Sequence, residues 1–170
     1  MALRFTEKGL LDKRFFELCS VIANLSEDKS RKVGAVIVDE NNAVKATGFN
    51  CFPVSIRKEI SSRHERTNGE KYYWVEHAER NAIYSAARSG ISLAGCRMYA
   101  TLFPCADCVR ALIQCGIVEL NTYAKPENDL VFSRSFEVAA EMIKESNIRL
   151  RIFSESDKKM STSEYGSDQI

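Results

Sequence analysis

Two short fragments of the chain carry the side chains best suited to chemistry. The first is His77-Ala78-Glu79, and the second is Pro104-Cys105-Ala106-Asp107-Cys108. The two cysteines are three positions apart, so a single helical turn would carry both sulfur atoms on one face. An imidazole from a neighbouring helix start would complete three zinc ligands. A fourth position would stay open to water, which is the arrangement of a catalytic zinc site.

Glu79 follows the histidine by two residues, close to the metal but poorly placed to ligate it alongside His77. A carboxylate there can take a proton from a water molecule and pass it to a ring nitrogen and then to a departing amine. The arrangement H-x-E…P-C-x-x-C is typical of zinc-dependent nucleobase deaminases. We therefore expect one Zn²⁺ per chain, bound by His77, Cys105 and Cys108, with Glu79 as the catalytic proton carrier.

Each part of this motif has another interpretation when it is taken alone. A C-x-x-C pair in an α/β chain can be a redox pair. A structural zinc site would need a fourth ligand, for which His64 or a third cysteine could be proposed. His64 falls in a polar loop and reads more simply as a solvated residue or a substrate contact. The combination of all four residues favours the catalytic zinc site.

Alternating helices and strands must position these fragments. Helical periodicity predicts a first helix over residues 10–25, and two β-branched runs, 33–38 and 44–49, predict a hairpin. Residues 50–75 read as a long irregular connection, which is more often functional than idle. The rest alternates: helices from 76 to 89, 104 to 115 and 132 to 144, and strands over 98–102, 118–123 and 150–153.

This order predicts an α/β fold, a three-layer α/β/α sandwich around a five-stranded mixed sheet. Strands that alternate with helices favour a parallel sheet covered on both faces, and the opening hairpin adds an antiparallel edge. We expect one zinc-dependent deaminase domain over residues 1–153. The tail 154–170 is rich in Ser, Lys, Glu and Asp, which predicts disorder.

Composition narrows the setting of this domain. The formal net charge is +1, so no global basic field draws in nucleic acid. No stretch approaches the roughly 20 apolar residues of a membrane span, and the N-terminal residues lack the apolar run of a secretory signal. With six cysteines in the chain, we expect a reducing, cytoplasmic setting and read the four cysteines outside the motif as buried thiols.

Residues 11–153 resemble the cytidine/deoxycytidylate deaminase superfamily and look most like its deoxycytidylate (dCMP) deaminase branch. Five segments carry the resemblance: 32–38, 48–53, 77–83, 98–108 and 113–117. The resemblance implies that Asn50 contacts the substrate sugar or base and that the backbone at Ala78 and Glu79 holds the pyrimidine edge. It also implies a homo-oligomer, either a dimer or a hexamer.

The connection before His77 is what distinguishes the dCMP branch from compact cytidine deaminases. Its basic residues suit a 5′-phosphate, because a guanidinium can bind phosphate through two hydrogen bonds. Its aromatic residues could stack on the base or pack under the loop. Arg66, Lys71 and Tyr73 are therefore our candidate substrate contacts in this segment.

One position departs from the family pattern. Cys51 stands where the family's nucleotide-binding loop commonly has glycine, and no glycine follows Pro53 before Gly69. In regulated members this loop contributes to a dCTP effector site that relies on glycine for close backbone approach. The difference argues against control by dCTP and leaves room for a changed substrate.

We expect hydrolytic deamination of dCMP to dUMP with release of ammonia, by zinc-activated water. One alternative is deamination of another cytosine nucleotide, namely modified dCMP, CMP or dCTP. A second is deamination of a base in RNA or DNA, which would need a basic, aromatic-lined path for the flanking nucleotides. A non-catalytic scaffold stabilised by zinc is a third, although a scaffold has no use for Glu79.

Overall fold

The computed structural model describes residues 7–127 and 129–154. Its elements in chain order are α1 (Glu7–Ala23), β1 (Gly34–Val38), β2 (Val44–Phe49), the 3-10 turn η1 (Ser61–His64), α2 (Lys71–Trp74), α3 (Ala78–Arg88), β3 (Arg97–Ala100), α4 (Ala106–Gln114), β4 (Glu119–Tyr123), α5 (Ser133–Glu145) and β5 (Arg149–Phe153). The predicted elements are confirmed, with boundaries that differ by a few residues. All but the first residue of the predicted tail 154–170 lies outside the described residues.

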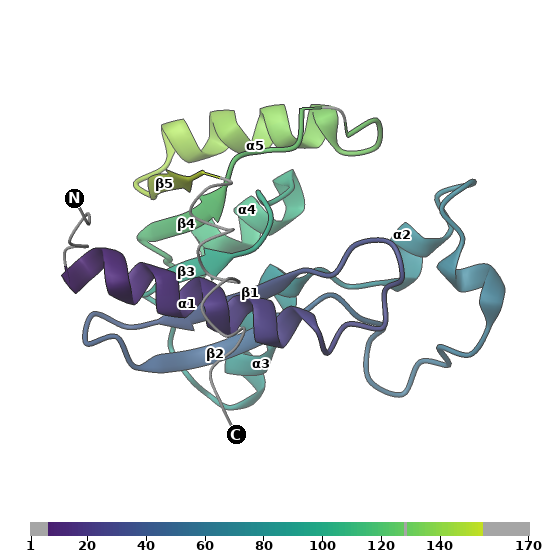
Figure 1. The fold of residues 1–170 in the computed structure, drawn as a ribbon, viewed down its shortest axis with the longest axis horizontal. Coiled ribbons are helices and arrows are strands. Elements are labelled where there is room, and N and C mark those ends of the chain that lie inside the picture. The colour runs from purple at the N-terminus through teal and green to yellow at the C-terminus, as the bar shows by residue number, and fades with distance from the viewer. Residues whose placement is uncertain (1–6, 128, 155–170) are drawn as a thin grey trace, which may run out of the picture.

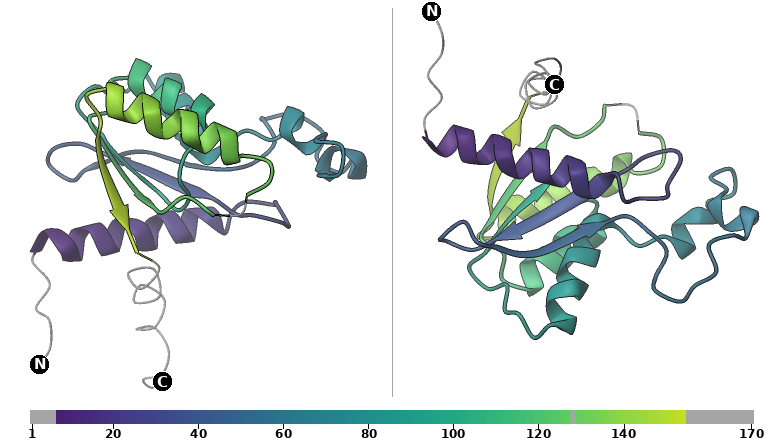
Figure 2. Two further views of the ribbon diagram at one scale, coloured as in Figure 1. Left: turned by 90° about the horizontal axis from the view of Figure 1, so that it is seen from above. Right: turned by 60° about the horizontal axis from the view of Figure 1, so that its bottom comes forward.

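The sheet has five strands in the order β2-β1-β3-β4-β5. Strand β1 is antiparallel to both β2 and β3, while β3, β4 and β5 run parallel. Helix α1 covers one face, and α3, α4 and α5 cover the other, as the left view of Figure 2 shows. The predicted three-layer α/β/α sandwich with a mixed sheet is therefore confirmed.

Two buried clusters fill the space between these layers. The larger lies between the sheet and α3, α4 and α5, and the smaller lies under α1. All five residues of β1 are buried, because neighbouring strands flank it and helices cover both of its faces. This burial on both faces explains why the strand is a continuous apolar run in the sequence.

Helix α1 faces the sheet with Phe15, Phe16 and Cys19, which are buried, whereas Leu10 is 48% exposed and Leu25, which follows the helix, is 62% exposed. A carboxylate of this helix is also buried: Asp12 accepts hydrogen bonds from Tyr99 in β3 and Arg151 in β5.

Two glycines let helices approach strands closely. A Cβ atom at Gly34 would lie 2.0 Å from the Cys19 carbonyl oxygen of α1, and one at Gly48 would lie 2.3 Å from the Ala78 carbonyl oxygen of α3. Residue 48 is two positions before Asn50 and residue 78 directly follows His77. This contact therefore brings the end of β2 against the helix start that carries the first half of the chemical motif.

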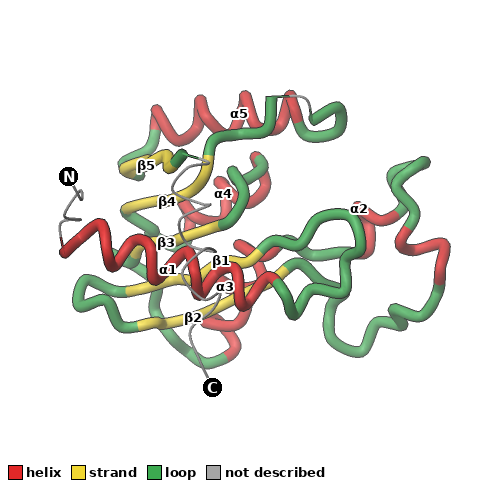
Figure 3. The backbone as a smooth tube through the Cα atoms, viewed as in Figure 1, coloured by secondary structure: helices red, strands yellow, loops and turns green. Residues whose placement is uncertain are grey.

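The 50–75 connection extends away from the end of the sandwich, at the right of Figure 1. It is mostly loop, with only η1 and the single turn α2 as regular structure (Figure 3). An isolated bridge between Cys51 and Glu76 closes its base through two backbone hydrogen bonds of 3.1 and 2.8 Å. Among the described helices, none is both long enough and apolar enough to cross a membrane.

Candidate active site

Two helix starts carry the predicted metal ligands. His77 directly precedes α3 and Cys105 directly precedes α4, both with extended backbones, and Cys108 lies in the first turn of α4. The helices pack side by side against the same face of the sheet. Because the N-terminal end of a helix carries partial positive charge, this placement favours thiolate over thiol.

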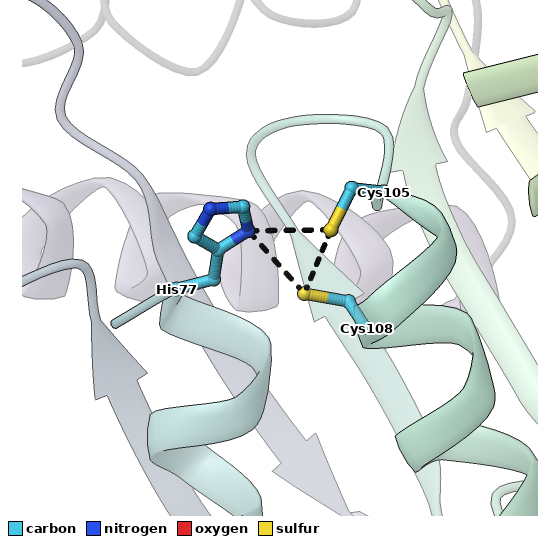
Figure 4. Close-up of side chains that lie close together, drawn as sticks. All are labelled: His77, Cys105 and Cys108. Carbon is cyan, nitrogen blue, oxygen red and sulfur yellow. Dashed lines mark hydrogen bonds between the residues drawn. The ribbon is translucent and has the colours of Figure 1, made fainter. Parts of the chain in front are cut away.

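The three ligand atoms converge on one point (Figure 4). The Nδ1 atom of His77 lies 3.4 Å from the Cys105 sulfur and 3.5 Å from the Cys108 sulfur, and the two sulfurs are 3.6 Å apart. In the described part of the chain, the group of donor atoms within 4.8 Å of one another stops at these three. Within residues 7–127 and 129–154, the geometry thus offers a set of three metal ligands.

These separations fit a tetrahedral zinc ion. With Zn–S near 2.3 Å and Zn–N near 2.0–2.1 Å, tetrahedral angles place neighbouring ligand atoms about 3.5–3.8 Å apart. The observed distances of 3.4 to 3.6 Å are within a few tenths of an ångström of that range. The donor set of one imidazole and two thiolates is also one that zinc prefers.

The pKa values of the two thiols follow from their hydrogen bonds and their burial. The hydrogen bond with Cys108 lowers the pKa of Cys105 to about 4, opposed by burial and helped by His77. The pKa of Cys108 is correspondingly raised by the hydrogen bond with Cys105 and by burial. Since zinc binds thiolates and neutral imidazole, metal binding must release these protons, and zinc affinity rises with pH.

Glu79 lies in the first turn of α3 and is 3% exposed, although its neighbours in the sequence include charged residues. It lines the same pocket as His77 and Cys105. Burial raises the pKa of its carboxyl group. A carboxyl group beside the metal donors and open to the pocket is placed to exchange protons with a bound molecule.

Glu76 holds the start of α3 in place. Its carboxylate accepts a hydrogen bond of 2.8 Å from the His77 backbone N–H and one of 2.7 Å from the Arg80 guanidinium. Its backbone pairs with Cys51, so the same residue ties the histidine turn to the end of β2. The histidine is thus oriented by the base of the 50–75 connection as well as by its own helix.

The pocket that His77 and Cys105 line has an apolar and a polar group of lining residues, called here its apolar wall and its polar wall. Leu102, Phe103, Phe132 and Phe136 form the apolar wall. The polar wall comes from the loop after α1, from the end of β2 and from the 50–75 connection, and it consists of Asp28, Ser30, Arg31, Asn50, Arg66 and Lys71. An apolar slot with a polar rim suits a flat heteroaromatic base that carries a polar substituent.

Asn50 and Ala78 lie where the resemblance implies, both lining the pocket. The Asn50 side-chain nitrogen donates to Asp28 Oδ2 at 3.0 Å and to the Arg31 carbonyl at 2.9 Å. Its side-chain oxygen accepts from the Val33 backbone N–H at 2.8 Å. Because an amide oxygen has two lone pairs, one acceptor position of Asn50 remains for a ligand.

The two basic candidates of the 50–75 connection, Arg66 and Lys71, also line the pocket, but they differ in whether their charged groups are free to bind a ligand. The Arg66 side chain is exposed, and its Nε donates to the Tyr72 hydroxyl at 3.1 Å. Lys71 is 8% exposed, forms an ion pair with Asp28 and donates to Ser30 Oγ at 2.8 Å. The guanidinium of Arg66 is thus open to solvent, and the ammonium of Lys71 is engaged within the wall.

The structure does not bring Tyr73 to the pocket. Its side chain is 85% exposed, whereas the adjacent Tyr72 lines the pocket and packs edge-on against Phe132 at 5.3 Å. Neighbouring residues on the single turn of α2 point in different directions, so only one of the two tyrosines can face inward. Tyr72 therefore replaces Tyr73 as the aromatic residue of this segment.

His64 is also placed away from the metal donors. Its ring lies 4.9 Å from the Phe52 ring and its Nε2 is 2.5 Å from the Lys58 carbonyl oxygen. It lines a second cavity together with Cys51. Cys19 and Cys96 are buried as expected, but Cys51 and Cys115 are only partly buried, and all six cysteines are free.

Sequence reasoning missed an ion pair between the pocket residue Arg31 and Asp129. Asp129, in the loop before α5, pairs with Arg31 at 2.6 Å and accepts hydrogen bonds from the backbone of Val131 and Phe132. This pair joins two loops that are far apart in the chain. A polar run after the first helix, residues 27–32, was the signal available for Arg31, but nothing near Asp129 distinguishes it from a turn residue.

The sequence matches known proteins along most of its length. The model of the cytidine and deoxycytidylate deaminase zinc-binding region matches residues 11–124, which include all three metal donors. The deoxycytidylate deaminase of Enterobacteria phage T4 is 39% identical over 168 residues, covering 72% of this chain and 85% of that protein. A Drosophila melanogaster protein named "Probable deoxycytidylate deaminase" is 36% identical over 117 residues, or 64% of this chain. The chain spans 57% of the length of that Drosophila protein.

Solved structures share the fold. The dCMP deaminase of cyanophage S-TIM5, solved in complex with dCMP and dUMP, superposes with a TM-score of 0.67 at 20% identity. The match covers 88% of this chain and all of the phage chain. The sandwich, the converging zinc donors and the sequence matches agree, and the chain belongs to the cytidine and deoxycytidylate deaminase family with its zinc-binding region.

Proposed function

We propose that the protein catalyses the hydrolytic deamination of dCMP to dUMP, with water consumed and ammonia released. The observation that carries this proposal is the position of Glu79, a buried carboxyl group beside three zinc donors in a pocket suited to a flat base. The name of the phage T4 relative and the nucleotides in the S-TIM5 structure, dCMP and dUMP, support the choice of substrate.

His77, Cys105 and Cys108 would hold the zinc ion in this reaction. When bound, zinc would supply Lewis-acid chemistry that lowers the pKa of the attacking water. Glu79 takes the proton that this water loses as its oxygen bonds to C4, and delivers that proton to N3 of the cytosine ring. Glu79 then moves the proton of the new C4 hydroxyl to the amine, and the C4–N bond breaks as ammonia leaves and the C4 carbonyl forms. The backbone at Ala78 and Glu79 holds the edge of the pyrimidine.

Asn50 contributes by accepting a hydrogen bond. Both of its side-chain N–H groups are already used inside the wall, so its amide can offer the substrate only the remaining lone pair of its oxygen. The complementary group on the nucleotide is a donor, that is, a sugar hydroxyl or an amine. Asn50 therefore orients the substrate without changing protonation state.

Arg66 binds the 5′-phosphate in this proposal. Its guanidinium is solvent-exposed at the pocket mouth and is paired with a tyrosine hydroxyl rather than with a carboxylate. A dianionic phosphate can therefore approach it without displacing an ion pair. Lys71, whose ammonium is ion-paired within the wall, is not assigned to the phosphate.

The remaining proposals concern the setting of the enzyme. We propose a single deaminase domain over residues 1–153, a homo-oligomer (dimer or hexamer) and a cytoplasmic location. The six free cysteines support a reducing compartment. The exposed Tyr84 of α3 and Ile113 of α4 offer apolar surface for self-association, which light scattering of the purified chain would test.

An ultraviolet absorbance screen tests the reaction directly. The zinc-loaded protein is incubated with cytosine and adenine nucleosides and with their mono-, di- and triphosphates, with and without dCTP, and ammonia is measured in parallel. We expect dCMP to be turned over with the highest kcat/KM and one ammonia to form per dUMP. A higher kcat/KM for CMP or dCTP would replace dCMP as the proposed substrate. Zinc binding without turnover of any nucleotide would favour the hypothesis of a non-catalytic scaffold.

A further inference from the structure

We propose that Lys71 is a positioning residue that fixes the amide of Asn50 through Asp28, rather than a phosphate ligand. This inference rests on the proposed function only in taking Asn50 as a substrate contact. The geometry itself involves three side chains from three separate segments: the loop after α1, the end of β2 and the turn α2.

Lys71 is a charged residue inside the pocket wall. Its ammonium forms an ion pair with Asp28 Oδ2 and donates to Ser30 Oγ at 2.8 Å, and its side chain is 10% exposed. Lysine is almost never buried to this degree without a partner. The pair with Asp28 therefore accounts for the burial of both residues and attaches the root of the 50–75 connection to the body of the domain.

Asp28 connects Lys71 to the other residues of the polar wall through its two carboxylate oxygens. Its Oδ2 atom accepts from Lys71 and also from the Asn50 amide at 3.0 Å. Its Oδ1 atom accepts from the Ser30 backbone N–H and hydroxyl, both at 2.8 Å, and from the Arg31 backbone N–H at 3.2 Å. One buried carboxylate thus contacts residues from all three segments that form the polar wall.

Asn50 has almost no freedom within this arrangement. Its backbone N–H donates to the Val33 carbonyl at 3.2 Å, and its backbone carbonyl accepts from Ser26 Oγ at 2.6 Å. Its side-chain amide is oriented by three hydrogen bonds, to Asp28, to the Arg31 carbonyl and from the Val33 N–H, because only the NH₂ group can donate and only the oxygen can accept. Of these three partners, Asp28 is the one that contacts Lys71.

A cation is what allows Asp28 to stay charged there. Burial alone would raise the pKa of Asp28, but hydrogen bonds from Lys71 and Ser30 outweigh burial and hold that pKa below its usual range. A buried carboxylate that loses its cation either takes up a proton or moves toward water. Either change weakens one of the three hydrogen bonds that orient the Asn50 amide, and the amide is then held only by the Arg31 carbonyl and the Val33 N–H.

A second cavity of about 620 Å³ shares part of this wall and supplies a matched control. Asp28, Ser30, Asn50 and Lys71 line both cavities. Lys58 lines only the second one, and its ion pair with Glu27 at 2.7 Å is exposed, with 64% of the lysine side chain open to solvent. Lys58→Met therefore removes a neighbouring lysine–carboxylate pair without touching Asn50.

The first measurement does not require turnover. In a ¹⁵N-labelled protein, the side-chain amide of Asn50, assigned by its loss in Asn50→Asp, should exchange slowly with solvent. Lys71→Met should speed this exchange about tenfold, the value of one buried hydrogen bond. Lys58→Met should leave it unchanged. An Asn50 amide that exchanges equally slowly in Lys71→Met would overturn the inference, whether or not the protein deaminates dCMP.

The second measurement separates positioning from phosphate binding. If Lys71 acts through Asn50, then Lys71→Met should lower kcat/KM about tenfold for both dCMP and deoxycytidine, mainly through KM. A lysine that binds phosphate would instead lower the value for dCMP alone, which is the result we expect for Arg66→Ala. A loss confined to dCMP in Lys71→Met would therefore contradict the proposal.

The double variant Asp28→Asn/Lys71→Met tests the proposal even if Lys71→Met alone fails to fold. It removes both charges together, so no unpaired charge is left in the wall. We expect it to bind zinc and melt cooperatively while its Asn50 amide still exchanges faster than in the wild type. A double variant with a wild-type exchange rate would show that Asn50 is held without the ion pair and would refute the role of Lys71.

Discussion

The backbone N–H of Ala106 donates a hydrogen bond of 2.9 Å to the hydroxyl of Ser135. Ala106 directly follows the ligand Cys105 and opens α4, whereas Ser135 belongs to the first turn of α5. The first N–H groups of a helix have no partner within the helix, so a hydroxyl from a neighbouring helix can satisfy one of them. This contact fixes the turn that carries both sulfur ligands.

Ser135→Ala should therefore weaken zinc binding about tenfold, the low end of the effect of outer-shell partners on metal affinity. The variant keeps all three ligands but leaves the Ala106 N–H without its acceptor. Competition with a chromophoric chelator measures the affinity. Ser133→Ala, an exposed residue two positions earlier on the same helix, is the control, and equal affinity in both variants would show that the hydroxyl has no effect on the metal.

Glu79→Ala should keep zinc and fold but lose at least about 100-fold in kcat, because the proton carrier is gone while the three donors remain. Zinc content by atomic absorption, the circular dichroism melting curve and the absorbance assay report these properties separately. Glu137→Gln, on the exposed surface of α5, is the control. Substantial turnover by Glu79→Ala would remove Glu79 from the proton-transfer steps.

Arg66→Ala should raise KM for dCMP about tenfold and leave kcat within a factor of two, because a charge-assisted hydrogen bond to the phosphate acts equally on the ground state and the transition state. The KM for deoxycytidine should not change. Arg63→Ala is the matched control, since the Arg63 guanidinium stacks on the Trp74 ring at 3.8 Å and does not line the pocket. Equal effects of the two variants would indicate a general loss of positive charge rather than a specific contact.

The metal site could be predicted because its signals are local. His77 and Glu79 are two residues apart, Cys105 and Cys108 are three apart, and each pair opens a helix. Helical and alternating apolar patterns were enough to give the order of the elements and the mixed sheet. The convergence of the two pairs then follows from the packing of α3 and α4 on one face of that sheet.

The ion pairs of the polar wall could not be predicted, because their partners lie far apart in the sequence. Lys71 and Asp28 belong to distant segments, and nothing local shows that a lysine in a charged loop becomes buried. Asp129 and Arg31 are likewise joined only by the fold. The burial of Asp12 in α1 likewise involves distant partners, Tyr99 and Arg151. Apolar periodicity carries no information about such pairs.

Arg151→Met should lower the free energy of unfolding by about 3–5 kcal/mol, because removing one partner of a buried ion pair leaves the other charge buried and unpaired. Arg151 donates to both carboxylate oxygens of Asp12 at 2.9 and 2.6 Å and to Asn121 at 2.9 Å, and the Asp12 side chain is 2% exposed. Urea unfolding measures the change. Arg14→Met, which removes an exposed pair with Glu17 on the same helix α1, should cost less than about 1 kcal/mol.

Acid should destabilise the protein through three buried carboxylates. Burial opposes ionisation of Asp28, Asp129 and Glu119, but their hydrogen bonds to lysine, arginine, backbone and amide groups outweigh it, so the pKa of each is lower in the folded state than its ordinary value. As the pH falls, the unfolded chain therefore binds protons at these groups at a higher pH than the folded protein does. The stability that these groups contribute is complete above pH values of about 4, the ordinary pKa of Asp and Glu, and is lost as the pH falls through the lower folded-state values.

Urea midpoints measured from pH 7 down to pH 3 test this linkage. The wild-type midpoint should fall steeply below about pH 4. Asp129→Asn should be less stable than the wild type at pH 7, because it loses the ion pair with Arg31, and should lose less further stability on acidification. The exposed Glu137→Gln should follow the wild-type curve. If Asp129→Asn instead ran parallel to the wild type across the whole range, Asp129 would not contribute to the acid response, and the loop before α5 would be held by its backbone contacts alone.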